Sequence, residues 1–425
     1  MARVAISHGI NAIENVKACI SKLGEINQIL RKDLTVFIKP DLTLPLGPPV
    51  TVHPHVLGSI VKLCQEMGAK EIYIGFNPFD GISSRQLLKL MGLDYYLENL
   101  GATILTLENE PYSSIKVETP LFFKSLSVPE KLSHSDVFIS VVAPRTDVFD
   151  GFALGLKNYF DLLLDSQKQQ LLQSGSLTGL LDFYKKYPPQ LTIWDATTIG
   201  EGQGPFNPRA VPYNLMLASS NLLAGDSTVT RLMGVDPIQV ELLKIAMINH
   251  LGTVDPKDIL VTGENLANHC KKIEMATRSS KNVSKWIEII QGTPCIGCQI
   301  CLRYFLDFLL RFIEKDLKEF GGFSVFLGKF QNNLIHNIKT AGILFGNCAI
   351  SSNLNITFAN TGLKKKSIFK FPGCPPLNLR SIEKFCLEFK EKLPALEIVE
   401  EIIRKWTIGR PSKSSSVVPI NDTGL

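Results

Sequence analysis

The sequence predicts an α/β protein with mostly parallel, doubly wound sheets in its main part and a smaller C-terminal α/β domain. Up to about residue 262, short β-branched runs alternate with amphipathic segments, and strands separated by helix-length crossovers pair in parallel. Near residue 292 the composition changes, and a group of cysteines opens a second stretch of helix and strands. We therefore expect one domain over 1–290, with room for two lobes, a cysteine-rich domain over 291–408 and a disordered tail over 409–425.

The elements of the main part follow from hydrophobic periodicity. Apolar side chains between Ile13 and Leu23 recur at helical spacing, and a buried strand over 34–38 ends at Lys39. The same alternation predicts, in chain order, a helix over 55–67, a strand over 71–75, a helix over 85–97, and strands over 102–107, 137–142, 191–194, 215–218 and 259–262.

The C-terminal part shows one helix with a single apolar side. Leu302, Phe305, Leu306 and Leu309 share a helical face, while charged residues occupy the opposite face. The remaining predicted elements are strands over 324–327, 341–345 and 367–371 and a closing helix over 379–393.

Bulk composition narrows the class of protein. Hydrophobic residues make up 45% of the 425 residues and charged residues 20%, which is typical of folded globular chains. The net charge is +5, but the basic residues are scattered, so we expect no nucleic-acid partner. There is no apolar stretch near the ~20 residues that a membrane span requires, and no secretory signal. These features predict a cytoplasmic protein, and its nine cysteines favour reduced thiols and metal ligands over disulfides.

Three cysteines stand close together in the C-terminal part. Cys295, Cys298 and Cys301 form a C-x2-C-x2-C pattern, in which three thiolates can surround one centre as a cubane iron-sulfur cluster requires. Zinc is the main competitor, although zinc sites more often use two separated cysteine pairs. The spacing favours one 4Fe-4S cluster.

A fourth ligand has to come from elsewhere in the chain. Cys348 and Cys374 each follow a predicted strand, at the sheet edge where open α/β sheets collect ligands. Both stay open as the fourth ligand, and either could instead be an inert buried thiol. Core packing is expected for the other cysteines, which are Cys19, Cys64, Cys270 and Cys386.

Polar residues at strand ends in the main part suggest a second site. Lys39 and Asp41 stand where a strand meets a Gly/Pro-rich loop, a place that suits an anionic group. Lys157 precedes an asparagine, and Asp195 ends a strand before a glycine-rich loop. Each signal is weak alone, because such residues are often merely solvated. Asp226 has the simpler explanation of a charge or cap at a helix start.

Short motifs together resemble a known family, the domain of unknown function 362. They are Phe37-Ile-Lys-Pro-Asp-Leu42, Gly155-Leu-Lys-Asn158, Trp194-Asp-Ala196, Gly202-Gln-Gly-Pro205, Ala224-Gly-Asp226, Arg231-Leu-Met-Gly234, Asp236-Pro237 and Val261-Thr-Gly-Glu264. The resemblance covers roughly residues 30 to 265 and implies attachment to an iron-sulfur domain. Two positions depart from the family pattern: Asp41 replaces an asparagine, and Arg145 lies where a Lys- and His-containing segment is usual.

The leading functional hypothesis is an iron-sulfur oxidoreductase. Its C-terminal cluster would pass electrons from a redox partner protein or small carrier to a small anionic substrate or cofactor. Lys39, Arg145 and Lys157 would hold this group, and Asp41 and Asp195 would position it or bind a metal. One alternative is a lyase or isomerase that uses the cluster or a metal as a Lewis acid. Another is a binding module with a structural metal site, since a fold does not determine a function.

Overall fold

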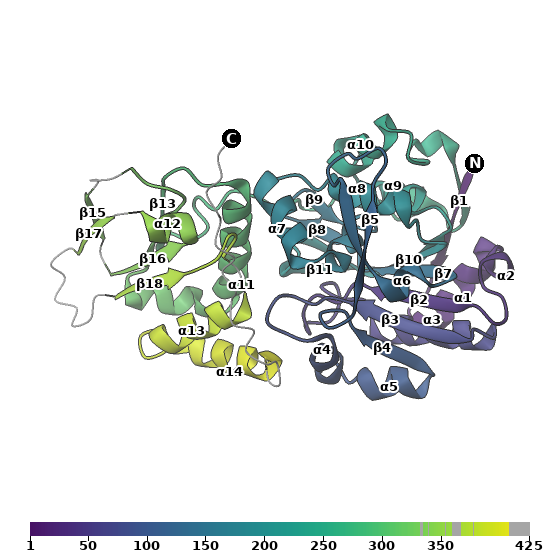
Figure 1. The fold of residues 1–425 in the computed structure, drawn as a ribbon, viewed down its shortest axis with the longest axis horizontal. Coiled ribbons are helices and arrows are strands. Elements are labelled where there is room, and N and C mark those ends of the chain that lie inside the picture. Colours follow the sequence, from purple (N-terminus) through teal and green to yellow (C-terminus); the bar gives the residue numbers. More distant parts are fainter. Residues whose placement is uncertain (332–334, 339, 353, 359–366, 377, 408–425) are drawn as a thin grey trace.

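The computed structural model describes residues 1–331, 335–338, 340–352, 354–358, 367–376 and 378–407 (Figure 1). The predicted tail over 409–425 lies outside these residues. Two main sheets organise the described chain, one of ten strands and one of four. Within the described ranges, no helix has both the length and the apolar character needed to cross a membrane.

The large sheet is a mixed but mostly parallel α/β sheet, as the sequence predicts. In spatial order its strands are β12 (Ile259–Gly263), β1 (Ala2–His8), β11 (Asn207–Ser219), β10 (Leu191–Gln203), β7 (Val137–Val142), β2 (Thr35–Pro40), β3 (Glu71–Phe76) and β4 (Ala102–Thr106), with β8 (Arg145–Asp147) and β9 (Gly151–Ala153) attached to β10. Pairing is antiparallel at β1–β11, β10–β11 and β8–β9 and parallel elsewhere. All ten strands belong to one sheet.

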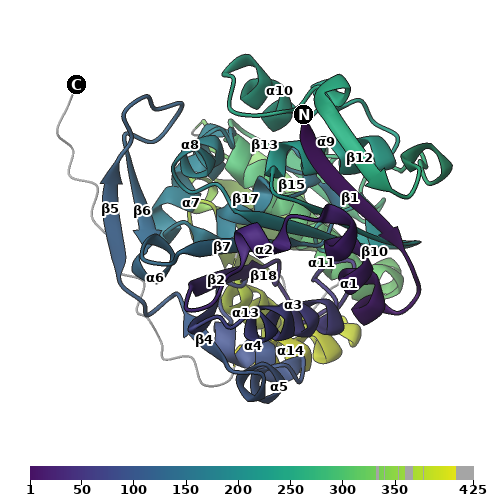
Figure 2. The same cartoon turned by 90° about the vertical axis from the view of Figure 1, so that its right-hand side faces the viewer.

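Helices cover both faces of this sheet, with α1, α3, α4 and α5 on one side and α8, α9 and α10 on the other (Figure 2). The helices of this part are α1 (Ala12–Leu23), α2 (Ile26–Ile29), α3 (Pro54–Glu66), α4 (Ser84–Leu90), α5 (Asp94–Asn99), α6 (Glu130–Ser133), α7 (Asp165–Ser174), α8 (Gly179–Lys186), α9 (Leu222–Leu232) and α10 (Glu241–Ile248), with 3-10 turns η1 (Lys157–Leu162), η2 (Pro237–Gln239), η3 (Pro256–Asp258) and η4 (Leu266–Asn268). A hairpin of β5 (Tyr112–Lys116) and β6 (Ser125–Pro129) projects from the side. The arrangement is doubly wound.

The second sheet is parallel throughout. Its strands, in spatial order, are β13 (Ile287–Gln291), β14 (Phe323–Leu327), β16 (Ala341–Phe345) and β18 (Ser367–Phe371), and a separate pair joins β15 (Ile335–Ile338) to β17 (Asn355–Phe358). Its helices are α11 (Ile296–Phe320), α12 (Asn347–Ser351), α13 (Leu379–Phe389) and α14 (Ala395–Thr407). β13 starts just before the expected boundary at 291.

Helix α11 lies between the two sheets (Figure 1) and contacts α7 and β11 on one side and α14 on the other. It extends beyond the predicted segment at both ends, since it begins among the cysteines and continues to Phe320. Its Phe305 ring packs 4.8 Å from that of Phe371 and 5.5 Å from that of Phe385. The helix therefore joins the two parts through a common hydrophobic core.

Candidate functional site

The cysteine triplet forms the amino-terminal end of α11. Cys295 is the N-cap, and its Sγ accepts a 3.4 Å hydrogen bond from the backbone N–H of Cys298. Cys298 and Cys301 follow within the first two turns, and each is only 3% exposed. The positive end of the helix dipole therefore lies at the three thiols, where it favours negative charge.

The two remote cysteines follow neighbouring strands, as the sequence predicts. Cys348 comes after β16 and Cys374 after β18, and these strands pair in parallel. The two loops are tied together, since the Gly373 N–H donates to Oδ1 of Asn347 at 2.8 Å and the Asn347 N–H donates to the Gly373 carbonyl at 3.0 Å. Both cysteines thus sit on one edge of the small sheet.

Cys374 lies within electrostatic range of the triplet. Burial raises the pKa of the Cys301 thiol, and charge on Cys295 and Cys374 raises it further. The pKa of Cys298 is likewise raised by burial and then by the neighbouring cysteines, Cys374 among them. A Cβ on Gly346, in the loop before Cys348, would lie 3.3 Å from the Cys298 sulfur. The thiols of Cys298 and Cys301 therefore lie within electrostatic range of Cys295 and of Cys374.

Among the described residues, no group of three or more His, Cys, Asp or Glu side chains is arranged to hold a metal ion.

The cysteines outside this region divide into two kinds. Cys19, Cys64 and Cys386 are buried, as expected for core thiols. The expectation for Cys270 was wrong: its side chain is exposed, because it stands in the irregular segment after η4, where its thiol donates to the Leu266 carbonyl at 3.3 Å.

Lys39 lies in a buried ionic network at the carboxyl end of β2. Its side chain is 0% exposed, and its ammonium donates to Oδ1 of Asn158 at 2.5 Å and to Oδ2 of Asp161 at 2.9 Å. Asn158 in turn donates to the Ser140 hydroxyl at 2.9 Å on the adjacent strand β7. The Lys-Asn motif of η1 therefore positions the lysine of β2.

Arg145 and Asp41 form a second buried pair in the same region. The Arg145 guanidinium donates two hydrogen bonds to the Asp41 carboxylate, one of 2.6 Å from Nη1 to Oδ2 and one of 3.1 Å from Nη2 to Oδ1. Burial alone would lower the pKa of Arg145, but the Asp41 charge and hydrogen bond outweigh it and raise that pKa. Arg145 and Asp41, the two positions at which the sequence departs from the pattern it resembles, are thus paired with each other.

Lys157 completes the network next to two carboxylates. Its ammonium lies 3.4 Å from Oδ2 of Asp147 and 3.6 Å from Oδ1 of Asp150, and it forms no hydrogen bond. Burial raises the pKa of Asp150 to about 6, opposed by the Lys157 charge. Three cations therefore face four carboxylates, those of residues 41, 147, 150 and 161.

Asp195 stands apart from these pairs. Its carboxylate accepts from the His53 backbone N–H at 2.7 Å and from the Thr197 hydroxyl at 2.5 Å, and burial raises its pKa. The structure thus brings Lys39, Arg145 and Lys157 together with carboxylates, whereas Asp195 fixes the start of α3.

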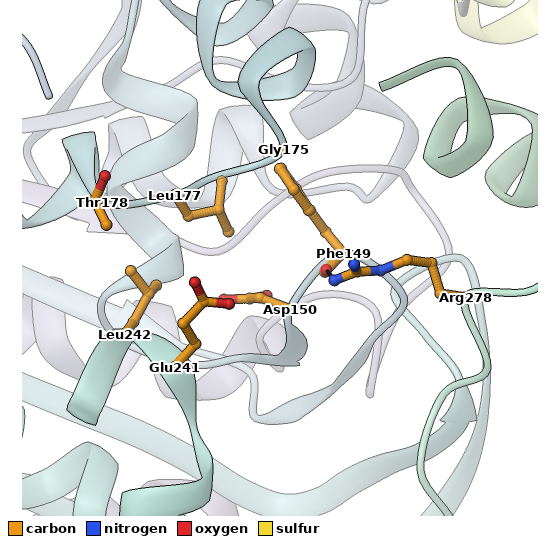
Figure 3. A pocket seen from close by; sticks show the side chains of 8 residues that line it. All are labelled: Phe149, Asp150, Gly175, Leu177, Thr178, Glu241, Leu242 and Arg278. Atoms are coloured by element: carbon orange, nitrogen blue, oxygen red, sulfur yellow. Dashed lines mark hydrogen bonds between the residues drawn. The ribbon is translucent and has the colours of Figure 1, made fainter. Parts of the chain in front are cut away.

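A small pocket borders the network at Asp150 (Figure 3). The carboxylates of Asp150 and Glu241 point into the same space, and the Arg278 side chain reaches towards Phe149, whose carbonyl accepts a hydrogen bond from the guanidinium. The rest of the wall is formed by Gly175, Leu177, Thr178 and Leu242. A second, apolar pocket lies along α11 and includes Tyr304 and Phe308.

Asp226 is not a helix cap, contrary to expectation. Helix α9 starts earlier, with Asn221 as its N-cap, so Asp226 lies in the second turn. Its carboxylate accepts from the backbone N–H groups of Gly155 at 2.7 Å and Leu156 at 2.9 Å and from the Trp194 indole at 2.8 Å. It therefore supports the start of η1 and hence the network.

Sequence reasoning missed Tyr304, which contacts the network from the cysteine-bearing helix. Its hydroxyl donates to Oδ1 of Asp147 at 3.1 Å. The available signal was its position three residues after Cys301, one helical turn further along α11. Asp150 and Asp161 were missed too, because no strand end or glycine-rich loop marks them.

Comparison with known proteins found three similarities. The thylakoid-associated protein sll1697 of Synechocystis sp. (strain ATCC 27184 / PCC 6803 / Kazusa) is 22% identical over 236 residues, 54% of this chain and 72% of that protein. The lactate racemase apoprotein from Thermoanaerobacterium thermosaccharolyticum superposes with a TM-score of 0.34 at 15% identity, over 52% of this chain and 55% of that one, so the chain spans about half its length. Residues 36–231 match the family described as Domain of unknown function (DUF362). This match lies within the stretch, roughly residues 30 to 265, over which the motifs resemble that family.

Proposed function

We propose that this chain is an iron-sulfur oxidoreductase in which one 4Fe-4S cluster, held by Cys295, Cys298, Cys301 and Cys374, exchanges single electrons with a group bound by the α/β domain. Two observations support it: three thiols stand at the start of α11, and charge on Cys374, after β18, acts on two of them. Four cysteine thiolates are the donor set of a cubane cluster, which contacts each sulfur through a separate iron atom.

The surroundings of the thiols suit an anionic cofactor. The N-terminal N–H groups of α11 point towards the cysteines, and the helix is long enough for its dipole to act there. Gly346, with φ of +96°, lets the loop after β16 pass close to Cys298. When bound, the cluster would supply single-electron transfer, at a potential set by burial and by hydrogen bonds to the sulfurs.

The ionic network supplies the polar side of the proposed site. Lys157 is the cation best placed to take an anionic group, because its ammonium lacks a hydrogen bond, whereas Lys39 donates two hydrogen bonds and Arg145 three. Asp150, with a pKa of about 6, can hold or release a proton beside it near neutral pH. A redox partner or small carrier would deliver the electrons.

Metal analysis of the full chain tests this proposal. Anaerobically purified or reconstituted protein should contain about four iron and four sulfide per chain and give the electron paramagnetic resonance signal of a reduced 4Fe-4S cluster. Cys298→Ala and Cys374→Ala should lose most of the iron. Cys348→Ala and Cys386→Ala are the controls, since one is the exposed alternative ligand and the other a buried core thiol.

The outcomes separate the alternatives. Zinc in place of iron would overturn the redox proposal and favour a structural metal site. Loss of iron in Cys348→Ala but not in Cys374→Ala would reassign the fourth ligand. A cluster that keeps its full iron content in both Cys374→Ala and Cys348→Ala would indicate three cysteine ligands and favour Lewis-acid chemistry.

A further inference from the structure

The DUF362 domain contacts one of the proposed cluster ligands directly. The Gln173 side-chain amide, at the end of α7, donates a 3.1 Å hydrogen bond to the sulfur of Cys374 and lies 3.4 Å from the carbonyl oxygen of the same residue. Gln169, one turn earlier, also donates to that carbonyl. We propose that Gln173 is a positioning residue through which the DUF362 domain sets the reduction potential of the cluster. This inference rests on the proposed function.

The physical basis is charge on the sulfur. Reduction adds an electron to the cluster and makes its thiolate ligands more negative, so a donor to a ligand sulfur stabilises the reduced state more than the oxidised state. A hydrogen bond from an amide N–H therefore raises the reduction potential. Partners of this kind are known to tune metal centres without contacting the metal.

Close backbone packing holds Gln173 in place. A Cβ on Gly297, between Cys295 and Cys298, would lie 2.6 Å from the Leu172 carbonyl oxygen, and a Cβ on Gly175 would lie 2.5 Å from the Ile296 side chain. Leu172 and Gly175, the residues of these two close contacts, stand before and after Gln173 in the sequence. The end of α7 thus packs closely against the turn that carries the cysteines. This packing fixes the direction from which the Gln173 side-chain amide reaches Cys374.

The same segment leads into the pocket of Figure 3. Gly175, Leu177 and Thr178 follow directly after α7 and form part of its wall, opposite Asp150 and Glu241. A ligand that displaced this wall would also displace the end of α7. The hydrogen bond therefore gives the cluster a direct structural connection to that pocket.

The test is a redox titration of the cluster in the full chain, followed by electron paramagnetic resonance. Gln173→Leu should lower the midpoint potential, and Gln173→Glu, which keeps the side-chain length but places a carboxylate at the sulfur, should lower it further. Gln170→Leu is the matched control, because Gln170 is an exposed glutamine on the same helix. The midpoint potential of the cluster in Gln170→Leu should equal that in the unaltered protein.

Failure of the inference differs from failure of the proposed function. If the unaltered chain binds no cluster, both the proposed function and the role of Gln173 are overturned. If it binds a cluster and the Gln173 variants titrate at the potential of Gln170→Leu, only the role of Gln173 is overturned. If Gln173→Leu lost iron, Gln173→Glu would carry the same comparison with Gln170→Leu.

Discussion

The hydroxyl of Tyr304 donates a 3.1 Å hydrogen bond to Oδ1 of Asp147, and this bond connects α11 to strand β8 of the large sheet. Tyr304 lies one turn after Cys301, and Asp147 lies 3.4 Å from the Lys157 ammonium. The Tyr304 ring also packs edge-on against Phe206 at 4.9 Å. The Tyr304 side chain thus joins the cysteine-bearing helix to the ionic network.

Tyr304→Phe should destabilise the protein while leaving the packing of the ring intact. The buried carboxylate of Asp147 loses one donor and keeps the Phe149 backbone N–H at 2.6 Å, so we expect a loss of about 1–3 kcal/mol in the free energy of unfolding. Urea denaturation measures this loss. Tyr95→Phe is the control, since Tyr95 is 74% exposed and should shift the value by less than about 0.5 kcal/mol. Equal stabilities for the two variants would contradict the prediction.

Lys39→Met should lower the free energy of unfolding by more than Tyr304→Phe does, because it breaks a buried ion pair. The substitution leaves the Asp161 carboxylate and the Asn158 amide oxygen without their cation, for which we expect a loss of about 3–5 kcal/mol by urea denaturation. Lys17→Met is the control, since its pair with Glu14 is exposed and worth about 0.2–1 kcal/mol at most. If Lys39→Met unfolded at the same urea concentration as the control, Lys39 would not hold the strand end together.

Most of the fold was predictable because apolar periodicity reports which side of an element is buried. The parallel strands over 35–40, 71–76 and 137–142 are short, apolar and bounded by loops, so they were found nearly to the residue. The helix expected over 85–97 is two helices, α4 and α5, because Gly92 between them takes φ of +68°, which a continuous helix does not allow.

Two further strands could not be predicted from local pattern. β1 contains Arg3, Ser7 and His8 among its apolar residues, and it is a strand because β11 and β12 pair with it on either side. β13 pairs only at the edge of the small sheet. In both cases tertiary contacts determine the conformation.

The residues of the candidate site were predictable only where their spacing in the sequence indicates their chemical role. Cys295, Cys298 and Cys301 are marked by their separation, and the positions of Cys348 and Cys374 followed from the strands before them. Carboxylates brought in by folding leave no such pattern. Asp226 resembled a helix cap because its partners, two backbone N–H groups and an indole, lie far away in the sequence.

The buried carboxyl of Asp226 gives stability a dependence on pH. Burial raises its pKa from 3.8 to about 6, opposed by its three hydrogen-bond donors. Between these two values the folded protein binds more protons than the unfolded chain, so this group's contribution is fully present below pH 3.8 and is lost as pH rises through 6.

Asp226→Asn removes this titration, so the cost of the substitution should itself depend on pH. We expect it to destabilise the protein more at pH 4 than at pH 7, by a few kcal/mol at most, since each unit of pKa corresponds to about 1.4 kcal/mol. Urea denaturation of both proteins at the two pH values gives the difference directly. Asp136→Asn is the control, because that carboxylate accepts a hydrogen bond from the Thr35 backbone N–H at an exposed position. A cost of Asp226→Asn that is the same at both pH values would show that the folded carboxyl keeps its ordinary pKa, and that its three donors offset the effect of burial on that pKa.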